Sequence, residues 1–148
     1  MQSKVHLRKS DSLIKRLIPH LMSNGQLSKA EKLVHKAVDK IRKKKKKAAT
    51  RRVISRALLR VCPGIEVKSV RVGGGAFQVP FPISKRKQLS LGMSWLVKYA
   101  RKRPGRSMAS RFARELLDAH KGQGASVRKR KSLHKLARAN RAFAHFRW

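Results

Sequence analysis

The sequence predicts a mainly α-helical protein, with a body of six helices from which a two-stranded β-hairpin projects. Apolar residues recur every three or four positions along six separate segments, which is the spacing of a helix face. Between the third and fourth segments, the pattern changes to alternation around a glycine triplet, which is typical of a hairpin. The chain of 148 residues is long enough to bury a real hydrophobic core.

The N-terminal segment is expected to hold a flexible arm followed by the first helix. Residues 1–11 are mostly polar and basic, whereas residues 12–148 predict a single helical domain. The first helix would start at Ser12 and end at Asn24-Gly25, because glycine readily takes the left-handed conformation just past a helix end.

The second and third expected helices carry clear apolar faces. Ser28 and Glu31 match a capping box, so the second helix is expected to begin there. Its basic end, the run from Lys43 to Lys47, should fray because adjacent lysines repel one another. The third helix fits residues 50–61 and stops at Pro63, which cannot continue a helix.

Residues 65–82 predict the β-hairpin. Two β-prone runs flank Gly73-Gly74-Gly75, and their alternation places Lys68 and Arg71 on opposite faces. A phosphate-binding loop would instead end in Gly-Lys-Ser/Thr at a helix start, whereas Ala76 follows the glycines here. The ribbon is therefore expected to project as an arm from the helical body.

The C-terminal half predicts three further helices. Ser84 and Ser107 are the expected N-caps of the first two. The helix after Ser84 is apolar over so much of its circumference that it should form the centre of the bundle. The last helix is expected to run from about Ser126 toward Phe146 and to turn Leu136 inward.

The charge of the chain indicates a polyanionic partner. It has 40 Lys and Arg residues against 6 Asp and Glu, a net charge of +34, and such a surface repels itself. A hydrophobic content of 41% still allows helices to pack. This balance argues against an ordinary metabolic enzyme and favours nucleic acid, with an anionic membrane surface as a weaker second candidate. No apolar stretch is long enough for a transmembrane helix.

Residues that could carry catalysis or hold a metal are too scattered to do so. The single Cys62 rules out an internal disulfide, and the histidines show no zinc-binding spacing. Glu115 and Asp118 lie one turn apart and are expected to pair with Arg111 or Arg114. No nucleophile and base stand together, so we expect no enzyme activity, no cofactor and no metal.

Short basic runs recur on almost every segment, which predicts binding to nucleic acid. Some lie at helix starts, where backbone N–H groups also favour phosphate. The runs are Arg8-Lys9, Lys15-Arg16, Lys43 to Lys47, Arg51-Arg52, Lys85-Arg86-Lys87, Arg101-Lys102-Arg103 and Arg128 to Lys131. Charge alone leaves RNA and DNA open, so a DNA-compacting architectural protein stays an alternative.

Several strings of the sequence resemble the bacterial and organellar type of the ribosomal small-subunit protein seven family. The run VKSVRVGG at 67–74, followed by QVP at 78–80, resembles its hairpin. WLV at 95–97, ARKR at 100–103, MA at 108–109 and ELLDA at 115–119 resemble its middle helices. ANRAFAHFRW at 139–148 is similar to its C-terminal signature. The resemblance covers about residues 12–148 in order.

The resemblance implies both a fold and a role. The family has a six-helix body with an extended hairpin. It binds the 3′ major domain of small-subunit ribosomal RNA and nucleates assembly of the head. Its expected place is near the transfer RNA exit site, beside the ninth and eleventh small-subunit proteins. Exit-site transfer RNA and messenger RNA are further expected partners, and no membrane is expected.

The resemblance also implies which residues meet RNA. It places the hairpin residues Lys68, Arg71 and Gln78 on RNA, and Lys87 at the start of the following helix. Charge beside these positions extends the expected RNA-binding set to Lys85, Arg86, Arg8, Lys9, Lys15, Arg16, Arg101 and Lys102.

Three departures from the family pattern bear on the RNA contacts and on the compartment. The N-terminal arm is shorter than in typical bacterial members, so fewer arm contacts are expected. Val70 stands where a basic residue is common. Lys131, Ser132 and Arg138 replace positions that are often acidic. The short arm and the drift toward lysine favour a mitochondrial ribosome, with the plastid or the bacterial cytoplasm as alternatives.

Overall fold

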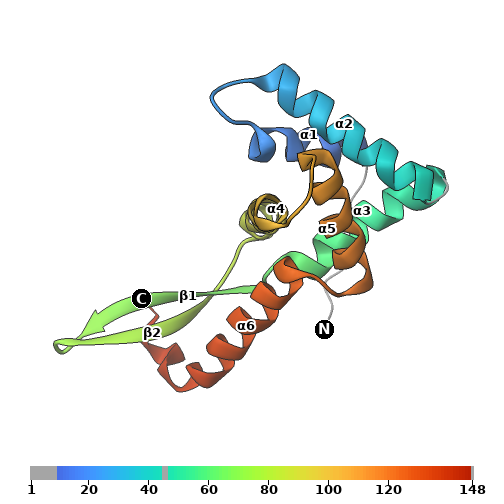
Figure 1. Cartoon of the computed structure of the whole chain (residues 1–148). Helices are drawn as coiled ribbons and strands as arrows, with labels where there is room; N and C mark the ends of the chain where they lie inside the picture. The colour runs from blue at the N-terminus through green and yellow to red at the C-terminus, as the bar shows by residue number, and fades with distance from the viewer. Residues whose placement is uncertain (1–9, 45–46, 148) are drawn as a thin grey trace.

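The computed structural model describes residues 10–44 and 47–147, and in them the fold is mainly helical, as predicted (Figure 1). Helices α1 to α5 pack into a body, and α6 runs beside the hairpin. The elements are α1 (Ser10–Leu21), α2 (Leu27–Lys44), α3 (Lys47–Val61), β1 (Ile65–Val72), β2 (Gly75–Pro82), α4 (Lys85–Lys102), α5 (Met108–Lys121), α6 (Ala125–Ala139) and the 3-10 helix η1 (Arg141–Phe146). No helix in this described part is long and apolar enough to cross a membrane.

Helix α1 begins two residues earlier than expected. It takes in Ser10 and Asp11, which were assigned to the arm, while residues 1–9 lie outside the described residues. The turn after it is as expected at Gly25, and Asn24 is left-handed as well, with φ values of 70° and 52°. In the lysine run, residues 45–46 also lie outside the described residues.

The expected capping box at the start of α2 is wrong. The helix already begins at Leu27, and the N–H of Ala30 donates to the carbonyl of Gln26 at 3.2 Å. Ser28 therefore stands inside the first turn, where it cannot act as the N-cap. The tight turn at Asn24 and Gly25 lets the helix start sooner than the sequence pattern indicated.

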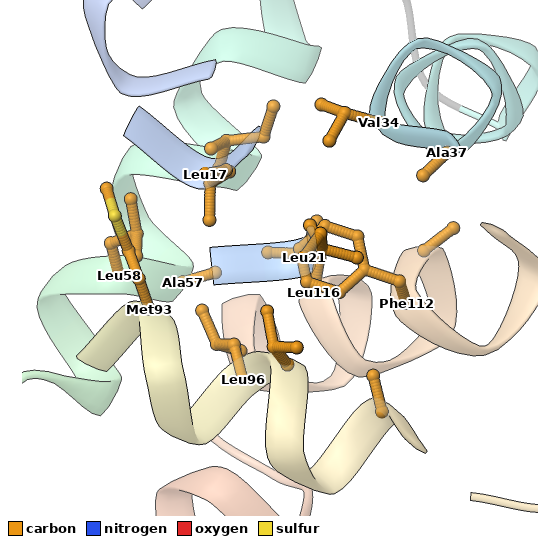
Figure 2. Packing of buried hydrophobic residues seen from close by; sticks show 14 of the residues in the cluster. Leu17, Leu21, Val34, Ala37, Ala57, Leu58, Met93, Leu96, Phe112 and Leu116 are labelled. Carbon is orange, nitrogen blue, oxygen red and sulfur yellow. The ribbon is translucent and has the colours of Figure 1, made fainter. Parts of the chain in front are cut away.

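The hydrophobic core lies between the five helices of the body and is closed by a single residue of α6, Val127. Figure 2 shows Met93 and Leu96 of α4 pointing toward Leu58, Phe112 and Leu116 on the facing helices. The predicted central helix, α4, contacts α1, α3, α5 and α6. Helix α5 contacts α2, α3, α4 and α6, so these two helices share the centre.

The hairpin occupies the predicted residues. β1 and β2 pair antiparallel, with Val72 opposite Gly75 and Ile65 opposite Pro82. The two-residue turn consists of Gly73 and Gly74, whose φ values are 54° and 82°. Two successive positive φ values match the twist of the strands and favour glycine at both positions.

The last helix is shorter than expected. α6 ends at Ala139, and Asn140 follows it as the C-cap. The carbonyl of Leu136 accepts from both the backbone N–H of Asn140, at 3.1 Å, and its side-chain Nδ2, at 3.0 Å. Residues 141–146 continue as the 3-10 helix η1, which turns back toward β2. Leu136 was expected inward but is exposed.

Arginines from neighbouring elements close the C-terminal ends of three helices. Arg101 donates to the carbonyl of Leu21 at the end of α1, at 3.3 Å. Arg111 donates to the carbonyls of Arg101 and Arg103 at the end of α4, at 3.0 and 3.3 Å. Arg60 donates to the carbonyl of His120 near the end of α5. Such ends carry free carbonyls and a negative dipole, so a guanidinium there stabilises the fold.

Candidate nucleic-acid interface

The predicted RNA-binding residues of the helices lie mostly on the surface. Lys15 and Arg16 are exposed on α1, and Lys85 and Arg86 are exposed in the first turn of α4. Ser84 stands at the N-cap of α4 as predicted, although its side chain makes no capping hydrogen bond. The first-turn N–H groups of α4 and these cations both favour an anion. Arg8 and Lys9 lie outside the described residues.

The hairpin presents two chemically different faces. The register puts Ser69 opposite Gln78 and Arg71 opposite Ala76, and these pairs share one face with two apolar pairs. Arg71, Ser69 and Gln78 are exposed, and no acidic residue lies on this face. We call these three residues the open face. Lys68, predicted to bind RNA with Arg71, lies on the opposite face, so the two do not form a single contact.

On the other face, a carboxylate joins the base of the hairpin to α4. Glu66 accepts from Lys87 of α4 at 2.7 Å and lies 3.3 Å from Lys68. The Lys87 hydrogen bond, assisted by Lys68, lowers the pKa of Glu66 despite some desolvation. Lys68 also stands 5.1 Å from the centre of the Phe81 ring. Part of the positive charge of these two lysines is therefore neutralised within the protein, unlike that of Arg71.

At the end of α4, Arg101 is both a predicted RNA-binding residue, like Lys102, and a residue with bonds inside the protein. Both residues are exposed. The guanidinium of Arg101 nevertheless bonds to the end of α1 and to the hydroxyl of Ser23 at 3.2 Å. Arg101 thus has an intramolecular role that the charge pattern did not indicate, and its contact with RNA stays a prediction.

Glu115 and Asp118 form an ion-pair network, but with a different partner from the expected Arg111 or Arg114. Arg103 lies 3.0 Å from Glu115 and 2.6 Å from Asp118. The carboxylate of Glu115 is only 1% exposed and also accepts from the backbone N–H and the hydroxyl of Ser126. It therefore caps the N-terminus of α6 from a neighbouring helix. The network fixes the direction in which α6 leaves the body.

A second contact ties α6 to the start of the hairpin. The N–H of Gly64 donates to Nε2 of His134 at 3.3 Å. Burial, assisted by the charges of Arg130 and Arg138, lowers the pKa of His134 and favours the neutral ring, which can accept this bond.

Sequence reasoning missed an aromatic cluster where the end of the chain meets the hairpin. Phe77 of β2 lies 5.1 Å from Phe143 and 5.4 Å from Phe146, measured between ring centres. The sequence feature that could have revealed the cluster is the spacing of three residues between Phe143 and Phe146. It was overlooked because an α-helix was expected to continue through this segment. In a 3-10 helix, residues three apart eclipse one another, so both rings point to the same side.

The described residues hold no arrangement suited to metal or thiol chemistry. No group of three or more His, Cys, Asp and Glu side chains in this part of the chain could hold a metal ion. Burial raises the pKa of the Cys62 thiol to about 11, which keeps it protonated at neutral pH and therefore a poor nucleophile.

Comparison with known proteins identifies the family of this chain. Residues 1–141 match the family described as "Ribosomal protein S7p/S5e". The chain is 46% identical over 136 residues to "Small ribosomal subunit protein uS7" of Francisella tularensis subsp. holarctica (strain OSU18), covering 92% of this chain and 87% of that protein. The protein of the same name from subsp. novicida (strain U112) matches equally well.

These relatives are bacterial and lend the mitochondrial prediction no support. The predictions of a seventh-protein relative and of a non-enzymatic chain are confirmed, and the chain belongs to the ribosomal protein S7p/S5e family.

Proposed function

We propose that this chain is a structural constituent of the small ribosomal subunit that binds and folds ribosomal RNA. The chain belongs to a family of ribosomal proteins, and the observation that carries the proposal is the open face of its hairpin. There, Arg71 stands exposed with Ser69 and Gln78, and no carboxylate on that face competes with phosphate. Lys15, Arg16, Lys85 and Arg86 add exposed cations on the body.

The finer part of the proposal follows the resemblance. The chain binds the 3′ major domain of small-subunit ribosomal RNA and organises the head near the transfer RNA exit site. Its neighbours there are the ninth and eleventh small-subunit proteins, with exit-site transfer RNA and messenger RNA within reach. The hairpin supports this proposal, since a narrow ribbon can enter between RNA helices, where shape and phosphate contacts dominate recognition.

The proposal also names the cellular compartment of the ribosome in which this chain works. The basic residues Lys131 and Arg138, at positions often acidic in the family, favour a mitochondrial ribosome, with plastid and bacterial cytoplasm as alternatives. Fractionation of the source cell, with this chain followed in the small-subunit peak of each compartment, decides between them.

The proposal is tested with a head-domain RNA fragment titrated at several salt concentrations. Each cation that neutralises a phosphate adds about 0.7–0.9 to the slope of log affinity against log salt. Arg71→Ala should therefore weaken binding and lower the slope by about that amount. Lys68→Ala should have a smaller effect, because Lys68 already shares the carboxylate of Glu66.

Lys32→Ala is the matched control, since Lys32 is exposed on α2 and has no predicted contact. An unchanged affinity and slope for Arg71→Ala would remove the hairpin from the RNA-binding surface. Competition between duplex DNA and the RNA fragment addresses the DNA-compacting alternative, which predicts that the duplex displaces the RNA.

A further inference from the structure

The last turn of the described chain packs its aromatic rings against the middle of the hairpin. The rings of Phe143 and Phe146 are nearly parallel, at 12°, with centres 6.4 Å apart. Phe77 lies against both of them at interplanar angles of 47° and 38°. Offset and tilted ring pairs at such distances attract one another. We call these three residues the aromatic brace.

The brace covers only one face of the ribbon. Phe77 stands opposite Val70 in the register, and neighbouring pairs on that face include Lys68 with Val79. Val79 is completely buried. The open face of Ser69, Arg71 and Gln78 lies on the reverse side, because side chains alternate along a strand. The 3-10 helix η1 therefore contacts the ribbon on the face of Phe77 and leaves the open face uncovered.

Without such support, the part of the ribbon beyond its base would be poorly held. An isolated two-stranded hairpin is marginally stable in water. At its base, the N–H of Ile83 donates to the carbonyl of Gly64 at 3.2 Å, and His134 accepts from the N–H of Gly64. These contacts fix the base alone, whereas the brace acts near the middle, at Phe77. Figure 1 shows the chain leaving α6 and folding back to β2 there.

We propose that the aromatic brace holds the hairpin in a fixed position in the free protein, and that the open face is the side of the ribbon presented to RNA. The second half of this proposal rests on the proposed function. A ribbon fixed before binding does not lose its freedom when RNA arrives, so binding is tighter for the same number of contacts. The brace residues thus act as positioning residues that carry no charge to RNA.

The first test measures amide hydrogen exchange of the full-length free protein. Phe143→Ala removes one ring of the brace, and Phe143 lies outside both the hairpin and the core cluster. Exchange of the β1 and β2 amides should become about threefold to tenfold faster, while that of the α5 amides stays unchanged. Leu136→Ala is the matched control, because it removes an exposed apolar side chain of α6. If the hairpin amides of Phe143→Ala exchange at the same rate as those of the wild-type protein, the proposed role of the brace is wrong.

The second test uses the head-domain RNA fragment with the same variants. Phe143→Ala should weaken binding by about threefold to tenfold without changing the salt slope, since no cation is lost. Arg71→Ala should change both quantities. Equal affinity of Phe143→Ala and wild type would show that the brace does not position the RNA-binding face. If the wild-type chain fails to bind the fragment, the proposed function fails, whereas the exchange measurement still decides whether the brace exists.

Discussion

At the scale of single residues, the closest packing at any described glycine joins Gly92 of α4 to Cys62 at the end of α3. A Cβ atom at Gly92 would lie 2.7 Å from the Cys62 sulfur and 3.3 Å from its Cα. The glycine therefore allows α4 to approach the preceding helix end directly. In the sequence, Gly92 lies in line with the apolar residues Leu89, Met93 and Leu96, but its contact with Cys62 follows only from the packing of the two segments.

Gly92→Ala is expected to lower the free energy of unfolding by about 1–2 kcal/mol. Overpacking of this kind costs about 1–3 kcal/mol, and the better helix propensity of alanine offsets about 1 kcal/mol. The net loss should lie in that range because two of the three nearest atoms belong to the backbone of Cys62. Urea denaturation measures it.

Two further variants separate the clash from a general effect of the substitution. Ser90→Ala, at an exposed position of the same helix, should leave stability almost unchanged. Adding Cys62→Ala to Gly92→Ala should restore part of the loss by removing the sulfur atom. A Gly92→Ala protein as stable as wild type would show that the two helices can separate at little cost.

The partners of charged residues show why sequence spacing alone is insufficient at this scale. Glu115 and Asp118 were expected to pair within their own helix, where Arg111 lies four residues before Glu115 and Arg114 four before Asp118. Their observed partner, Arg103, comes from the end of α4 and meets them only after α4 and α5 have packed. A guanidinium that bonds to two carboxylates in a partly buried site stabilises the fold more than exposed ion pairs within one helix, which contribute little.

At the scale of elements, the arginine contacts at helix ends are open to a direct test. Arg111→Met keeps the aliphatic stem but removes the donors to the carbonyls of Arg101 and Arg103. Thermal unfolding should show a loss of stability of about 1–2 kcal/mol, as for hydrogen bonds that involve a charged group at a partly exposed site. Arg114→Met removes the same charge from an exposed position of α5 and serves as the control. Equal stabilities of the two variants would contradict a role at the helix end.

Most elements follow from the sequence because local signals and packing agree. The apolar faces of α2 and α3 are buried as predicted, including Val34, Ile41 and Leu58. The two-glycine turn set the hairpin register, since both residues need positive φ. These signals lie within a few residues of the structure that they specify, so a pattern along the chain detects them.

The elements that were misjudged depend on contacts between segments far apart in the sequence. The end of α6 could not be found from periodicity, because apolar residues continue at helical spacing beyond Asn140. The helix ends where the chain turns back toward the hairpin, and there Phe143 packs against Phe77, which lies 66 residues earlier in the chain. The exposed position of Leu136 has the same cause, since the chain turns toward the hairpin after it.

At the scale of the whole molecule, the net charge of +34 predicts opposite effects of salt on the free chain and on its complex. Salt screens the repulsion among cations, so the Tm of the free protein should rise between about 0.05 and 0.5 M NaCl. The same salt should weaken binding to the head-domain RNA fragment. Calorimetry of the free protein and titration of the complex measure the two trends. A Tm that falls with salt would mean that attractive pairs, such as those of Arg103, outweigh the repulsion.

The arginines at the helix ends have a consequence for molecules that lose their fold. In the native state, the guanidiniums of Arg60, Arg101 and Arg111 are held by backbone carbonyls. Unfolding releases them, so a damaged chain offers more cations to any polyanion than an intact one. Tight binding to RNA is therefore no proof of a native protein. We expect a heat-treated sample to keep its affinity while losing its preference for the head-domain fragment over duplex DNA, which the same competition measurement would detect.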